Sequence, residues 1–385
     1  MGDEITVMES NPKTNQDVAT WQPIYIKTIG SYRRVLKKHG FFNTQIKIVN
    51  ETAGQLEELF CLRNPQTRFL GGFEKAQSTF AKQHLKTTRW FYFPWLNKLV
   101  AFLPEALHTE LRTGRNRNLI TNEEQKQFYN SHIAILGMSV GSHVALTIVL
   151  TGGGKYLTLA DPDTISGSNI NRIRTGFHNV GLNKTKAVAR QVYEINPYAK
   201  INIFPEGLND SNLKAFFKLK CDLVIEETDL PYLKIKVREL ARPLGIPVIM
   251  AADNADGVIA DVERFDQNKK LPILHGLIGN MSAAEYKNIS PQQLPKTMAK
   301  IAGANLSTVR MLESVMQVGK SIYSWPQLGN AATLCGSILA FIARSVILGK
   351  SIKSGRTNFS PQDVFLPATV TEIKNRNKFL KMLGL

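Results

Sequence analysis

The strongest constraint on the fold is a regular alternation of short apolar runs with helical patterns between residues 132 and 251. The apolar runs predict five strands, at 132–136, 156–160, 200–204, 222–226 and 247–251. The helical patterns lie between them, at 140–150, 184–195, 213–218 and 233–241. Strands that alternate with helices at this spacing form a parallel sheet with helices on both faces. We therefore predict an α/β fold with a doubly wound, Rossmann-like parallel sheet.

The segments on either side of this region differ from it. Residues 20–70 mix helical and β patterns, whereas the periodicity beyond Asp266 is mostly helical, at 291–301, 307–316 and 330–348. A length of 385 residues fits two or three domains. The predicted domains are an N-terminal α/β extension of unknown role at 1–110, a nucleotide-binding domain at 111–270, and a helical C-terminal region with a basic tail at 271–385.

Charge and cysteine content narrow the class of protein. The net charge is +17, and its densest excess lies in the C-terminal tail. This charge favours either an anionic partner, such as nucleic acid or a lipid surface, or simply a soluble basic exterior. Three widely separated cysteines exclude a zinc knuckle and a disulfide framework, which suits the cytoplasm. The apolar segment 331–348 contains Arg344, so we predict a buried helix rather than a membrane span.

The first predicted strand leads into a glycine-containing turn at residues 137–142, GMSVGS. Gly137, Ser139 and Gly141 would let backbone N–H groups approach phosphate oxygens at a helix N-terminus. The spacing G-x-S-x-G also occurs at the nucleophile of hydrolases. No later histidine lies in a strand-end loop with an obvious acidic partner, which disfavours a hydrolase.

Charged residues follow the ends of two later strands. Asp161 ends the second strand, where a carboxylate can accept ribose hydroxyls, and this feature alone also fits a nicotinamide dehydrogenase. The loop after it, at 161–172, reads DPDTISGSNINR and ends in Arg172; Lys184 begins the next helix, and EETD ends a later strand at 226–229. Two cations beside one nucleotide suit a triphosphate, whose charge must be neutralised before phosphorus is attacked. Hydride transfer needs no such pair.

Residues 115–265 resemble the ThiF/MoeB/ubiquitin-activating adenylyltransferase family. The matching segments, in order, are ADPDTISGSNINR (160–172), GLNK (181–184), INP (195–197), DLVIEETD (222–229) and GIPVIMA (245–251). Three further segments resemble a bacterial ThiF-type subgroup, some of whose members are fused to nitroreductase-like domains. These segments are DVERFD (261–266), LHGLIG (274–279) and SWPQL (324–328).

The resemblance implies a site for ATP and Mg²⁺. Asp161 would hold the ribose, Asn169 would contact the phosphates, and Asp229 would hold the metal. The implied catalytic residues are Arg172, Lys184 and Asp229. The implied cofactor-binding residues are Gly137, Ser139, Gly141, Asp161, Asp163, Asn169, Asn171, Arg115 and Arg117. Either Arg115 or Arg117 would reach the nucleotide of a partner subunit, and Asp163 and Asn171 have the alternative role of capping the loop.

Two features depart from the family pattern. The glycine turn is one residue and one glycine shorter than usual. The stretch after Ala251, where thioester-forming members carry a cysteine, has none, and Cys221 and Cys335 both lie in apolar patterns. A nucleophilic thiolate needs an exposed, electropositive setting. The sequence therefore predicts activation without a thioester.

The sequence as a whole predicts an ATP-dependent adenylyltransferase that forms an acyl-adenylate on a substrate carboxylate and releases pyrophosphate. The expected substrate is a peptide or carrier-protein C-terminus or a small molecule; tRNA is a further candidate. We expect a cytoplasmic homodimer without a membrane partner. The alternatives are an oxidoreductase that binds NAD or FAD on the same sheet, and a nucleotide-binding scaffold without turnover.

Overall fold

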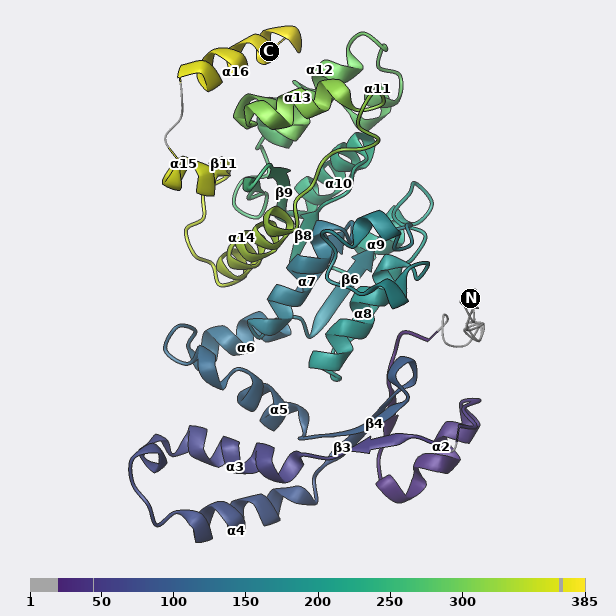
Figure 1. Ribbon diagram of the computed structural model, residues 1–385, viewed down its shortest axis with the longest axis vertical. Helices are drawn as coiled ribbons and strands as arrows, with labels where there is room; N and C mark the ends of the chain where they lie inside the picture. The colour runs from purple at the N-terminus through teal and green to yellow at the C-terminus, as the bar shows by residue number, and fades with distance from the viewer. Residues whose placement is uncertain (1–19, 44, 367–369, 385) are drawn as a thin grey trace, which may run out of the picture. The chain divides into compact units, whose positions relative to one another are not determined.

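The computed structural model describes residues 20–43, 45–366 and 370–384. They form two compact units, one ending at Arg117 and the other beginning at Asn118 (Figure 1). The sequence-based division at 110 and 270 stays a prediction. In the structure, residues beyond 270 supply one strand of the sheet of the second unit and a long helix that packs against that sheet.

The first unit is a four-stranded sheet flanked by helices. The strand order is β1 (Ile24–Ile26), β3 (Arg89–Phe93), β4 (Lys98–Phe102) and β2 (Lys47–Val49). The helices are α2 (Tyr32–Lys38), α3 (Thr52–Arg63), α4 (Glu74–Leu85) and α5 (Glu105–Arg112). α3 and α4 run side by side, and α2 lies at the other end of the unit (Figure 1).

An aromatic hairpin forms the core of the first unit. Pro94 ends β3, and Asn97, with a left-handed φ of 51°, turns the chain into β4. Trp90 and Tyr92 are buried with Leu36 of α2. The aromatic segment therefore serves packing, as its density of large apolar side chains suggests.

The second unit contains a seven-stranded sheet with the order β11-β10-β9-β8-β5-β6-β7. Five of these strands are parallel and lie where the sequence predicts them: β5 (His132–Leu136), β6 (Tyr156–Ala160), β7 (Lys200–Phe204), β8 (Leu223–Glu226) and β9 (Val248–Asn254). The prediction of a Rossmann-like parallel sheet is thus confirmed for these strands.

Helices cover both faces of this sheet, as a doubly wound fold requires. On one face, α7 (Val140–Leu150) contacts α8 (Lys184–Ile195) and α14 (Gly329–Ile347). On the other face, α9 (Leu213–Lys218) and α10 (Pro231–Leu244) pack on apolar side chains of β5, β8 and β9. α14 is long and apolar enough to cross a membrane by length and composition, but it packs against α7 and β9 and contributes buried residues to the core.

Two strands of the seven-stranded sheet were not predicted from the sequence. β10 (Gly257–Glu263) runs antiparallel to β9, and β11 (Gly355–Phe359) runs antiparallel to β10. The C-terminal region is otherwise helical, as expected. Its remaining helices are α11 (Ala283–Lys287), α12 (Leu294–Ala302), α13 (Val309–Gln317), α15 (Pro361–Phe365) and α16 (Val370–Met382).

Charged side chains are buried between β8, β10 and α10. Arg238 of α10 is fully buried and contacts both Glu226 of β8, at 3.0 Å, and Glu263 of β10. Lys234 also pairs with Glu226, at 3.1 Å. Burial alone would raise the pKa of Glu226, but Lys234 and Arg238 overcome it and hold the pKa below its usual value. These ion pairs join the two strands to the helix.

Candidate functional site

The glycine turn after β5 has a backbone that only glycine tolerates at its first position. Gly137 has φ +83°, and a Cβ there would lie 2.3 Å from the carbonyl oxygen of Glu227, in the segment after β8. At Gly141 a Cβ would lie 2.9 Å from Ile135, so this glycine lets α7 pack closely on β5. The first N–H groups of α7 have no partner within the helix, which makes this end suited to anions.

Asp161 joins the glycine turn to the loop that follows β6. It is only 5% exposed. One carboxylate oxygen accepts from the N–H of Met138 at 2.6 Å, and the other accepts from the N–H of Asp163 at 2.8 Å. Burial raises the pKa of Asp161, while Lys184 and these two donors oppose the shift.

Lys184 lies at the first position of α8 and is buried. Its ammonium group is 2.7 Å from the carboxylate of Asp163, whose side chain is largely exposed, and 3.9 Å from that of Asp161. Asn183, which the sequence analysis missed, accepts from the N–H of Thr185 and donates to the carbonyl oxygens of Asp161 and Asp163. Asn183 therefore fixes the start of α8 against the loop after β6.

Arg172 reaches the glycine turn from the far end of the same loop. Its Nε donates to the hydroxyl of Ser139 at 3.1 Å, and its Nη1 donates to the side chain of Asn171 at 3.0 Å. Burial lowers the pKa of the guanidinium, and the carboxylates of Asp253 and Asp229 oppose this shift. Arg172 thus contacts the glycine turn directly, and Lys184 lies near Asp161, which accepts from that turn.

The segment after β8 supplies further carboxyl groups. Glu226 accepts from the N–H and hydroxyl of Thr228, which shapes the turn before Asp229. The Asp229 side chain is exposed. Glu227 accepts from the N–H of Ala251 at 2.7 Å, and burial raises the pKa of Glu227 well above its usual range.

A second group of contacts, which the sequence analysis did not find, lies at the end of β9. Asp253 accepts from Nε2 of Gln327 at 2.8 Å and from the thiol of Cys335 at 3.2 Å. The carbonyl oxygen of Gln327 accepts from Asn171 at 2.8 Å. The SWPQL segment therefore bridges β9 and the loop after β6. Two signals in the sequence pointed to this group: Asp253 follows a predicted strand, as Asp161 does, and Gln327 lies in the SWPQL segment that resembles the family.

The other predicted site residues have local roles or lie in the first unit. Asn169 caps a short turn through Ser166. Arg117 donates to the carbonyl oxygen of Leu62 at 2.6 Å and pairs with Glu110 at 3.2 Å. Arg115 is exposed and makes no side-chain hydrogen bond or ion pair with the described residues.

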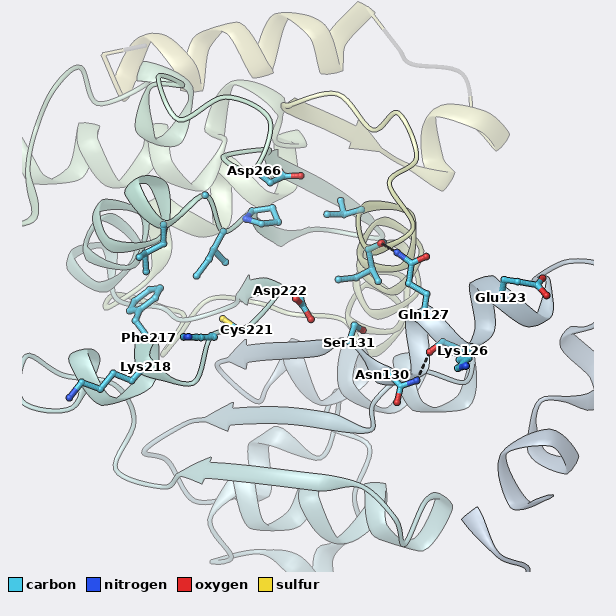
Figure 2. Close-up of a pocket in the computed structure, with 17 residues that line it drawn as sticks. Glu123, Lys126, Gln127, Asn130, Ser131, Phe217, Lys218, Cys221, Asp222 and Asp266 are labelled. Carbon is cyan, nitrogen blue, oxygen red and sulfur yellow. Dashed lines mark hydrogen bonds between the residues drawn. The ribbon is translucent and has the colours of Figure 1, made fainter. Parts of the chain in front are cut away.

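A cavity lies at the opposite edge of the sheet, where the strands begin. It has a volume of about 1100 Å³, and its lining includes Ser131 before β5, Asp222 before β8 and Pro247 before β9 (Figure 2). Nucleotides in open α/β sheets bind outside the carboxyl ends of the strands. We therefore assign the candidate site to the strand ends around Gly137 and Asp161, and not to this cavity.

The fold and the charges at the strand ends define a Rossmann-like nucleotide-binding protein. The model of the ThiF family matches residues 113–378. The chain therefore belongs to the ThiF family.

The chain is also similar to individual curated proteins and solved structures. The chain is 33% identical over 268 residues to the uncharacterized protein MT1398 of Mycobacterium tuberculosis, covering 70% of the chain but only 37% of that relative. It is 27% identical to the tRNA threonylcarbamoyladenosine dehydratase of Haemophilus influenzae, covering 63% and 94%. Among solved structures, PaaA has a TM-score of 0.47 at 19% identity (67% and 77% covered), and Escherichia coli MccB with ATP has 0.44 at 16% (79% and 82%).

Substitution of Gly137 by alanine tests the close approach of the glycine turn to the segment after β8. Gly137→Ala should destabilise the chain by several kcal/mol more than Gly181→Ala, because both residues have a positive φ but only Gly137 faces a backbone atom. Denaturant unfolding of the two variants measures the difference. Equal losses would show that the turn has room for a side chain.

Proposed function

We propose that the chain is an ATP-dependent adenylyltransferase that activates a substrate carboxylate. The observation that carries this proposal is the pair of cations, Arg172 and Lys184, on either side of a turn that Asp161 holds to the next strand. A carboxylate oxygen of the substrate attacks the α-phosphorus of ATP, the bond from that phosphorus to the bridging oxygen breaks, and pyrophosphate leaves. The product is an acyl-adenylate.

The side chains act by orientation and neutralisation of charge. Asp161 is placed to accept ribose hydroxyls, provided that they replace one of its backbone donors. Arg172 and Lys184 then exchange their present partners, Ser139 and Asp163, for phosphate oxygens. Preorganised cations of this kind stabilise charge that develops at phosphorus. We propose that Gly137, Ser139, Gly141 and Asn169 line the phosphates, and that Asp163 and Asn171 hold the two cations in place.

Mg²⁺ fits the carboxyl group of Asp229. This group is exposed, and the described residues contain no cluster of three ligands that would form a metal site by themselves. Mg²⁺ commonly binds through one or two carboxylates together with substrate phosphates and water. Mg²⁺ at Asp229 would neutralise phosphate charge as pyrophosphate leaves.

We further propose that no thioester forms. Cys335 is buried, and its thiol donates a hydrogen bond to Asp253; burial and two neighbouring carboxyls raise the pKa of this thiol far above the ordinary value. Burial raises the pKa of Cys221 to about 12. Neither group becomes a thiolate near neutral pH.

The substrate we propose is a carboxylate at the end of a peptide, a carrier protein or a small molecule; a tRNA acceptor and a cytoplasmic location are part of the same proposal.

The oxidoreductase and scaffold alternatives make different predictions. An oxidoreductase would consume reduced nicotinamide or flavin, and a scaffold would bind ATP without releasing pyrophosphate. The paired cations favour adenylation over both.

Trapping of the acyl-adenylate tests the proposed reaction. With Mg²⁺, ATP and a pool of peptides with free C-termini, the chain should release pyrophosphate, and hydroxylamine should capture the acyl group as a hydroxamate. Asp229→Asn should lower the rate about 100-fold or more, because one stabilising group of the transition state is lost. Asp210→Asn, an exposed carboxylate paired with Lys287, is the matched control and should leave the rate unchanged. Release of ADP and phosphate instead of AMP and pyrophosphate would contradict the reaction.

A homodimer in which Arg115 completes the partner's site is the second expectation. Arg115→Ala should abolish activity, whereas Arg117→Ala should cost only about 1 kcal/mol of stability through its exposed ion pair. Equimolar mixing of Arg115→Ala with Asp229→Asn should restore about a quarter of the activity, because half of the dimers are hybrids with one intact site. A monomer in sedimentation, or no recovery on mixing, would refute the shared site.

The absence of a thioester predicts that cysteine is dispensable. The variant Cys61→Ser/Cys221→Ala/Cys335→Ser should keep both pyrophosphate release and transfer to the acceptor. Serine at 335 preserves a donor to Asp253. Intact-mass spectrometry during turnover should detect no adduct that a reductant removes. An adduct on Cys335, or adenylation without transfer in the variant, would overturn the mechanism.

A further inference from the structure

A segment of the first unit is basic without any acidic residue. Residues 20–50 contain no Asp or Glu, and their cations are Lys27, Arg33, Arg34, Lys37, Lys38 and Lys47. All six side chains are exposed, and none forms an ion pair with the described residues. We call the four of these residues that lie on α2, namely Arg33, Arg34, Lys37 and Lys38, the basic surface. The next segment, 51–88, is different, because it contains four acidic residues, Glu51, Glu57, Glu58 and Glu74, together with its cations.

Two features of the basic surface work against the stability of its own helix, although Lys37 and Lys38 lie in the last turn, where the helix dipole favours cations. In α2, Arg33 and Lys37 are separated by four residues, as are Arg34 and Lys38, and like charges at this spacing repel. The first turn of α2 contains both arginines and no acidic residue, which is unfavourable near the positive end of a helix dipole. Charges that only make a surface soluble can lie at positions where they neither repel one another nor oppose the helix dipole. A bound polyanion would offset both.

Exposed aromatic side chains in the same segment indicate what kind of polyanion fits. Phe42, four residues beyond Lys38, is 70% exposed, and Tyr25 is 48% exposed. Unstacked bases stack on such rings, whereas duplex DNA, acidic peptides and lipid head groups offer no unstacked base. We propose that the basic surface binds single-stranded or looped RNA, with phosphates on α2 and a base on Phe42. This inference does not depend on the proposed adenylation.

Fluorescence anisotropy of the full chain with a labelled single-stranded RNA of about 20 nucleotides tests the inference. Each neutralised phosphate contributes about 0.7 to the slope of log affinity against log salt. The variant Arg33→Gln/Arg34→Gln/Lys37→Gln/Lys38→Gln should therefore lower the slope by about 2.8. Its fold should persist, because the substitutions remove repulsion within α2. A melting curve checks this.

The matched control lies on the other side of the first unit. Arg68→Gln/Lys75→Gln/Lys82→Gln/Lys86→Gln removes the same charge from exposed positions in and around α4 and should leave the slope within about one unit of the unsubstituted chain. Phe42→Ala should weaken RNA binding at least about fivefold but leave duplex DNA binding unchanged. Equal effects of the two quadruple variants would overturn the proposal. Binding of polyglutamate or of anionic vesicles as tight as that of RNA would likewise overturn it.

Discussion

The guanidinium group of Arg238 holds together parts of the second unit that would otherwise repel. Glu226 of β8 and Glu263 of β10 are both buried, and both contact this side chain. An unpaired carboxylate taken out of water costs several kcal/mol, so β8, β10 and α10 are stable only in combination. Because Glu226 also accepts from Thr228, the same group fixes the turn before Asp229. The site at the strand ends thus depends on an ion pair that lies outside it.

The sequence was sufficient to predict the five parallel strands and the helices between them, because their apolar runs are mostly buried; only the edge strand β7 has exposed polar residues within it. It was insufficient for β10, whose buried face includes Asp261 and Glu263. Charges normally indicate a surface segment. Their partners, Arg356 and Arg238, lie 95 and 25 residues away in the sequence, so the compensation is visible only after folding. β11 has a glycine, an arginine and an asparagine among its five residues, which are weak strand signals.

The candidate site also contains residues that the sequence could predict and residues that it could not. The residues that local patterns and the family resemblance indicate, such as Asp161, Arg172 and Lys184, come together around the glycine turn. Gln327 and Asp253 could not be assigned from local patterns, because their roles come from contacts across 74 residues between them and across 156 residues to Asn171. Asn183 follows a general capping pattern that gives no hint of the two carbonyl groups it also binds.

The position of β11 in the sequence determines when the edge of β10 becomes paired during synthesis of the chain. β10 pairs with β9 on one side and with β11 on the other, and Arg356 of β11 pairs with the buried Asp261 of β10. Until residue 359 has left the ribosome, the outer edge of β10 is unpaired, and Asp261 has His275 but not Arg356 as a partner. Such edges readily join to other chains. Residues 264–354, which lie between the two strands, must be made before this sheet acquires its last strand, and the nascent chain is exposed to misassembly at β10 throughout that interval.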